Sequence, residues 1–87
     1  MDEKRKKAVA LQYRHQVDRA PKVVAKGQGI IAERIIEIAA DHNIPLTRDP
    51  ALIEVLSKME LEQEIPPELY RAVAEILAYV YKMTGKL

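Results

Sequence analysis

The sequence predicts a small α/β domain, in which a short, mostly parallel or mixed sheet of about three strands is flanked by helices. Residues 22–26 centre on a short apolar run with β-branched side chains, as expected of a strand. Apolar side chains then recur at three- and four-residue spacing over 29–42, which indicates an amphipathic helix. Residues 44–47 are again mostly apolar, and Pro45 forces the residue before it to be extended. A strand, helix and strand of this length imply parallel pairing through a right-handed crossover.

The other elements follow from local signals. Residues 7–13 contain a nearly continuous apolar run, which is typical of a strand covered on both faces. Asp49 and Pro50 begin a short helix over 50–59, because aspartate accepts bonds from free amides and proline fits the first turn. Two prolines then open a last helix over 67–83.

The last helix is apolar over most of its circumference. Such a helix is either deeply buried or meets a partner. In a domain of 87 residues, full burial of two apolar stripes is hard to arrange, so a partner surface is expected here. The first stripe comprises Leu69, Val73, Ile76 and Val80, and the second comprises Tyr70, Ala74, Leu77 and Tyr81.

Length and composition indicate one domain over 1–87, with a basic N-terminal extension over 1–7. The chain has no cysteine, which excludes disulfides and thiolate metal sites. No apolar run approaches the ~20 residues that span a bilayer, so we expect a cytoplasmic protein. Residues 1–26 hold eight Lys/Arg and three Asp/Glu, whereas residues 27–87 hold six and ten, so the two parts carry opposite net charge.

Two basic segments allow alternative interpretations. Residues 4–7 either solubilise the terminus or contact nucleic acid, and four basic residues are a weak nucleic-acid signal. The turn from Lys26 to Gly29 either closes a tight corner or cradles a phosphate, although the fingerprint motifs for phosphate binding are incomplete. His15 and His42 have no neighbour at metal-ligand spacing, and no catalytic constellation is visible. We therefore expect no enzyme activity, no metal and no cofactor.

Six segments together resemble one known domain, the C-terminal cytoplasmic domain of the FlhB family. The members of this family are the substrate-specificity switch proteins of the flagellar and virulence type III export apparatus. The resemblance covers residues 8 to about 83. The segments that carry it are Ala8–Tyr13, Ala20–Gly29, Ala32–Ala39, Ile44-Pro45, Pro50-x-Leu52 and Ile65–Tyr81.

The sequence departs from the family pattern in two ways. Family members carry transmembrane helices before this domain, and they cleave themselves at an Asn-Pro-Thr-His motif, where the asparagine attacks its own carbonyl carbon. Here the matching positions are Glu3, Lys4, Arg5 and Lys6, and the one asparagine, Asn43, precedes isoleucine. The expectation is a free-standing, non-cleaving paralogue that contains only the part after the cleavage point.

The resemblance also implies that one edge of the sheet is unpaired. The family's strand upstream of the cleaved bond pairs with the sheet, and it has no counterpart here. An edge near Val9 and Leu11 is therefore expected to be open, and an open edge beside apolar residues invites pairing. Either residues 2–7 fold back over it, or another chain adds a strand.

Finally, the resemblance places a small apolar docking surface at Ala20, Pro21, Ala74 and Leu77; the alternative is that all four are core residues. The function it implies is a non-catalytic module of the flagellar export system that binds export substrates or export-gate proteins and is recruited to the membrane export gate. Metal and nucleic-acid partners are not expected. The competing interpretation is a small RNA- or nucleotide-binding domain that uses the basic N-terminus and the turn from Lys26 to Gly29.

Overall fold

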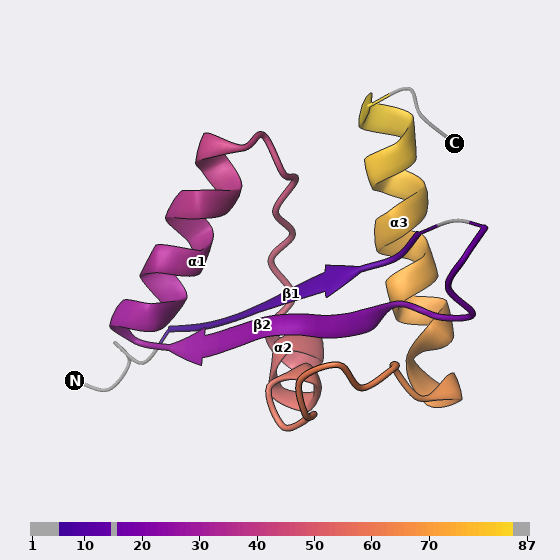
Figure 1. The fold of residues 1–87 in the computed structure, drawn as a ribbon, viewed down its shortest axis with the longest axis horizontal. Coiled ribbons are helices and arrows are strands. Elements are labelled where there is room, and N and C mark those ends of the chain that lie inside the picture. Colours follow the sequence, from indigo (N-terminus) through magenta and orange to yellow (C-terminus); the bar gives the residue numbers. More distant parts are fainter. Residues whose placement is uncertain (1–5, 15, 85–87) are drawn as a thin grey trace.

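A computed structural model describes residues 6–14 and 16–84, so Lys4, Arg5 and His15 lie outside the described residues. The described residues form a small α/β domain with a two-stranded sheet and three α-helices (Figure 1). Helices α1 and α3 rise at opposite ends of the sheet, and α2 lies below it in that view. The order of elements is β1 (Lys7–Gln12), β2 (Lys22–Gln28), α1 (Ile30–Asp41), α2 (Pro50–Leu56), the 3-10 helix η2 (Pro67–Leu69) and α3 (Tyr70–Thr84).

The two strands pair antiparallel, with Lys7 opposite Gln28 and Gln12 opposite Lys22. The register shifts between Ala10 and Leu11, where β2 contributes one extra residue, Val24. Such a bulge increases the local twist of the strand pair. The strands predicted over 7–13 and 22–26 are therefore both present, and the second extends two residues further.

The predicted third strand over 44–47 is wrong, and with it the parallel crossover, because these residues form an exposed loop. Asn43 has φ 56°, and the N–H of Ile44 donates to the carbonyl of Ala39 at 2.8 Å. This is a Schellman turn, in which the residue after a left-handed position bonds back into the helix. The Ile44 amide is thus used by α1, and Pro45 has no N–H to offer a neighbouring strand.

The free edge of β2 is instead covered by an irregular segment over 62–65. Val23 donates its N–H to the carbonyl of Gln63 at 3.0 Å, and Ile65 donates to the carbonyl of Pro21 at 2.9 Å. Lys22 and Glu64 form an isolated antiparallel bridge at the same place. This segment fixes the start of β2 against the chain that leads into α3.

Local signals place the helix ends close to their predicted positions. The Asp49 carboxylate accepts the N–H of Leu52 at 3.0 Å, so the predicted cap of α2 is present. Helix α2 ends at Leu56, earlier than predicted, because the next amides bond three residues back: Met59 donates to Leu56 at 3.0 Å. The last helix begins as η2, in which Leu69 donates to Pro66 at 2.9 Å.

The hydrophobic core lies where β2, α2 and α3 meet. Val23 and Val73 are completely or almost completely buried. Val9 and Leu11 of β1 pack against this core from the sheet and are half-buried. The buried residues of the core are Ala20, Val23, Leu52, Leu56, Met59, Ile65 and Val73.

Candidate functional site

A groove of about 400 Å³ runs along one flank of α3, and we call it the α3 groove. Its wall is the second apolar stripe of the last helix, and its other side is the segment that leads into β2. Val73, on the neighbouring stripe, holds α3 to the core, which leaves the second stripe accessible. The α3 groove is lined by Tyr13, Arg19, Ala20, Pro21, Ile65, Tyr70, Val73, Ala74, Leu77, Ala78 and Tyr81.

The structure brings all four predicted docking residues to the α3 groove, although two of them lie more than fifty positions from the others. Their exposure differs. Ala20 and Pro21 are buried, and Ala20 belongs to the core. Ala74 is exposed and Leu77 is half-buried. The core interpretation therefore fits the first pair, while the second pair presents apolar surface to solvent.

Four further residues of the α3 groove, aromatic or charged, were not among the predicted site residues. Tyr13, Tyr70 and Tyr81 supply aromatic surface, and Arg19 supplies a cation at the rim. Aromatic rings give a binding surface a large apolar area together with a polar edge. The helical spacing of Tyr70 and Tyr81 with Ala74 and Leu77 was a usable signal. No sequence signal places Tyr13 and Arg19 there, because the turn between the strands decides their position.

That turn is organised by one aspartate. Asp18 accepts the main-chain N–H of Arg14 at 2.7 Å and pairs with its guanidinium at 3.2 Å. The Arg14 side chain, followed by its main-chain amide, holds the pKa of the Asp18 carboxyl below its ordinary value. Hydrogen bonds to the charged form favour ionisation. The chain thus closes a tight turn directly before the groove residue Arg19.

The second predicted site, Val9 and Leu11, lies on β1, at the outer edge of the sheet. Gly29 donates to the carbonyl of Lys6, which makes positions 6, 8 and 10 the hydrogen-bonded positions of the pair. The backbone groups of Val9 therefore point away from β2. Leu11 lies opposite Val23, whose backbone bonds to the segment 62–65, so the groups of Leu11 also point outward. Among the described residues no third strand pairs with β1, and pairing by another chain stays a prediction.

The turn from Lys26 to Gly29 closes a corner between β2 and α1. The Lys26 ammonium donates to the main-chain carbonyls of Ser57 and Met59. Gly29 has φ 60° and donates its N–H to Lys6 at 2.8 Å. Two donors that a phosphate would need are thus already engaged, which disfavours the nucleotide-binding interpretation. The basic residues Lys4 and Arg5 of that interpretation lie outside the described residues.

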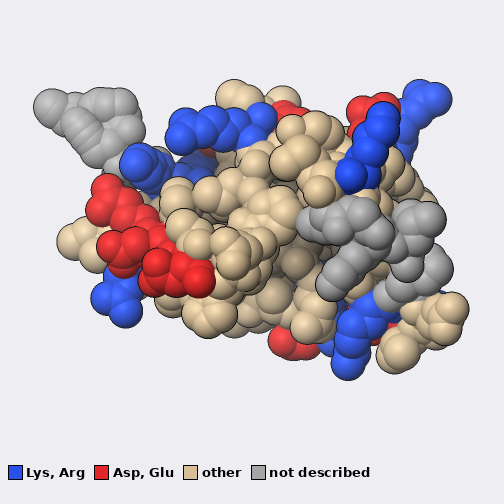
Figure 2. Space-filling view, turned by 90° about the horizontal axis from the view of Figure 1, so that it is seen from above, with Lys and Arg blue, Asp and Glu red and all other residues tan. Residues whose placement is uncertain are grey.

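The charged residues lie around an uncharged surface. On the face seen in Figure 2, uncharged side chains fill the middle and charged side chains gather toward the rim.

His42 caps α1, with Nδ1 2.9 Å from the carbonyl oxygen of Ile38. Within residues 6–14 and 16–84, no three His, Cys, Asp or Glu side chains group in a way that could hold a metal. Over the same residues, no helix has the length and apolar character needed to cross a bilayer.

Comparison with known proteins gives the family of this domain. The model of the FlhB HrpN YscU SpaS family matches residues 5–80, which is most of the chain. The chain belongs to this family. FlhB from Aquifex aeolicus is 51% identical over 74 residues, covering 84% of this chain and 21% of that protein. The uncharacterised protein YlqH of Bacillus subtilis is 41% identical over 78 residues, covering 90% of this chain and 84% of that protein.

Solved FlhB-family domains share the fold. The cytoplasmic domain of FlhB from Shewanella putrefaciens superposes with a TM-score of 0.81 at 39% identity, covering 86% of this chain and 63% of that one. The C-terminal domain of PscU superposes with a TM-score of 0.81 at 29% identity, covering 86% of this chain and 96% of that one. The chain spans about a fifth of the FlhB proteins it matches and most of YlqH. The FlhB family is the export switch of type III secretion and flagellar biosynthesis.

Proposed function

We propose that this FlhB-family chain is a non-catalytic protein-binding module that recognises export substrates or other components of the export gate through the α3 groove. One observation carries the proposal. The four positions that match the family's docking surface, Ala20, Pro21, Ala74 and Leu77, line a single groove. Their separation in the sequence does not by itself require the four residues to lie together. The fold creates the groove by setting α3 beside the segment that leads into β2.

Recognition in the α3 groove rests on apolar contact with a polar rim. Leu77 and Ala74 offer side chains that are accessible before a partner binds. Tyr70, which is 47% exposed, loses more apolar surface when a partner covers it. Contacts of this kind gain roughly 25 cal/mol per Å² of apolar surface removed from water. Arg19 at the rim adds a preference for partners with an acidic residue beside their apolar anchor.

The proposal assigns no bond-breaking step to this chain. The positions that match the family's Asn-Pro-Thr-His motif hold Glu3, Lys4, Arg5 and Lys6. A succinimide cannot form at this point without an asparagine or aspartate side chain. We further place the protein at the cytoplasmic side of the export gate, since the similar FlhB structure is that of a cytoplasmic domain.

The proposal is tested by placing a charge in the α3 groove. Leu77→Asp and Ala74→Glu should each weaken binding to purified early export substrates at least tenfold in calorimetry. Ala74 is exposed, so its variant reports on the surface with little effect on the core. Leu61→Asp is the matched control, because Leu61 is 55% exposed in a turn that does not line the groove. Binding by Ala74→Glu equal to that of the unmodified protein would overturn the docking assignment.

Unfolding must be separated from loss of binding. Circular dichroism and thermal melting of each variant show whether the fold persists. If Leu77→Asp unfolds while Ala74→Glu folds and binds normally, Leu77 acts as a core residue and the exposed Ala74 is not part of a docking surface. If both fold and neither binds, the α3 groove is the docking surface.

A second proposed contact is the outer edge of β1. The backbone groups of Val9 and Leu11 point outward, and β-strand addition uses such groups for main-chain hydrogen bonds. Lys7 pairs with Glu54 of α2 at 2.9 Å, which orients this end of the strand. The expected fold-back of residues 2–7 lies mostly outside the described residues, and Lys7 itself belongs to β1, so we propose that a strand from another chain pairs here.

A further inference from the structure

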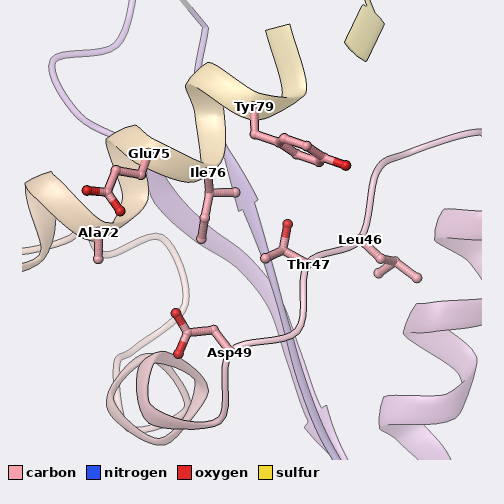
Figure 3. Close-up of a pocket in the computed structure, with 7 residues that line it drawn as sticks. All are labelled: Leu46, Thr47, Asp49, Ala72, Glu75, Ile76 and Tyr79. Atoms are coloured by element: carbon pink, nitrogen blue, oxygen red, sulfur yellow. The ribbon is translucent and has the colours of Figure 1, made fainter. Parts of the chain in front are cut away.

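A second hollow, of about 280 Å³, lies on the opposite flank of α3, between that helix and the loop over 46–49 (Figure 3). We call it the α3–loop pocket. Ala72, Glu75, Ile76 and Tyr79 line it from the helix. Their spacing of three, four and seven residues places them on one face. The α3 groove is lined by the other flank, so the two sites share no lining residue.

The α3–loop pocket combines an apolar floor with an acidic rim. Ala72 and Ile76 are half-buried at its base, and Leu46 contributes from the loop. Figure 3 shows the carboxylate of Asp49 pointing toward Ala72, and the ring of Tyr79 extending across above Thr47. Tyr79 is 57% exposed, so most of its ring is available to a ligand.

The two carboxylates lack a cation among the described residues. One oxygen of Asp49 accepts the N–H of Leu52, which fixes the carboxylate at the start of α2. Neither Asp49 nor Glu75 forms an ion pair with a described residue, including Arg48 and Arg71, which adjoin the pocket in sequence. Two anionic groups beside an apolar floor and an aromatic ring complement a long side chain with a cationic end.

We propose that the α3–loop pocket binds an arginine side chain presented by a partner polypeptide. The methylene groups of such a side chain lie against Ala72 and Ile76, and the guanidinium lies between Asp49 and Glu75. A guanidinium fits better than an ammonium, because it is planar, is weakly hydrated and can donate to two carboxylates at once. The volume, just below the ~300–1,000 Å³ typical of ligand pockets, suits one side chain and excludes a helix.

This inference goes beyond the proposed function and does not depend on the α3 groove. Its test uses Nα-acetyl-arginine methylamide as the probe, titrated into the ¹⁵N-labelled full chain at low salt. Saturable shifts are expected at residues 46–49 and 72–79. The citrulline analogue, which has the same shape without the charge, should bind at least fivefold more weakly. Raising the salt from ~50 to ~300 mM should weaken arginine binding, because exposed charges are screened.

Charge-removing variants make the test specific. Asp49→Asn with Glu75→Gln should raise the dissociation constant at least fivefold, and asparagine keeps the cap of α2. The control pair Glu33→Gln with Glu68→Gln removes the same charge from exposed sites outside the pocket. Equal binding by both pairs, or equal binding of citrulline and arginine, would overturn the proposal. The single variant Glu75→Gln, at an exposed helix position, keeps the test decisive if the double variant fails to fold.

Discussion

Gly27 and Ile31 are in direct contact, because a Cβ atom added to Gly27 would lie 2.2 Å from Cγ2 of Ile31 and 2.7 Å from its Cβ. The first turn of α1 therefore lies directly on the backbone of β2. The close atoms belong to the rigid part of a β-branched side chain, so they cannot move away without moving the helix.

We predict that Gly27→Ala lowers the free energy of unfolding by about 1–3 kcal/mol, as overpacking does in other proteins. Adding Ile31→Ala should recover only part of that loss, since it removes Cγ2 but leaves the Cβ at 2.7 Å. Urea denaturation of the two single variants and the double variant measures the coupling. Gly29→Ala is the control. Gly29 has φ 60° with open space around its Cβ position, so its cost should come from backbone strain and be independent of Ile31.

Lys26 stabilises the end of α2. Its ammonium donates to the carbonyls of Ser57 and Met59, which lie just after that helix. Lys26→Met keeps the apolar stem but leaves these carbonyls without the donor, so it should cost about 1.5–3 kcal/mol of unfolding free energy. Lys22→Met removes an ion pair with Glu62, whose side chain is 67% exposed, and should cost less than about 1 kcal/mol. Equal midpoints for the two variants in chemical denaturation would contradict this ranking.

Asp18 should give the fold a pH dependence in the acidic range. Its pKa is lowered in the folded state by Arg14, so the unfolded state binds a proton more readily. The stabilisation is complete above the ordinary aspartate pKa, near 4, and is lost as the pH falls through the lowered folded value. Asp18→Asn should therefore reduce the melting temperature at pH 7 and have a progressively smaller effect as the pH falls through the lowered folded-state pKa of Asp18. A difference that grows as the pH falls would contradict the assignment.

Amide exchange tests the outer edge of β1. Ala8 and Ala10 occupy positions that bond to β2, whereas Val9 and Leu11 have outward amides. The amides of Val9 and Leu11 should exchange faster than those of Ala8 and Ala10 when the edge is free. A bound strand should slow them selectively. If Val9 and Leu11 stay fast both alone and with candidate partners, neither residues 2–7 nor another chain covers this edge.

Much of the fold was predictable because local signals agree with the final contacts. The two strands and the cap at Asp49 occupy their predicted places. The strand over 44–47 was mispredicted because its apolar residues serve another purpose. Ile44 completes the turn that ends α1. The apolar residues of 44–47 give the same sequence pattern in such a turn as in a short strand. For the same reason, residues 44–47 were wrongly expected to pair with β2, which pairs with β1 instead.

The candidate site was only partly predictable. The spacing of Ala74 and Leu77 marks one flank of α3, and the family resemblance pairs this flank with Ala20 and Pro21. The α3–loop pocket could not be foreseen, because Leu46, Thr47 and Asp49 lie along a loop that was expected to begin with a strand. Only the path of that loop as it runs into α2 brings it beside α3.

Helix α1 packs mainly against β1 and β2, its nearest predecessors in the chain. Residues 7–41 therefore form a hairpin-plus-helix unit whose contacts close only short loops, which lowers the entropic barrier to its formation. The last two helices join this unit through Val23, Val9 and Leu11. Refolding should thus begin in the first half of the chain, and the two surfaces of α3 become available only in the final step.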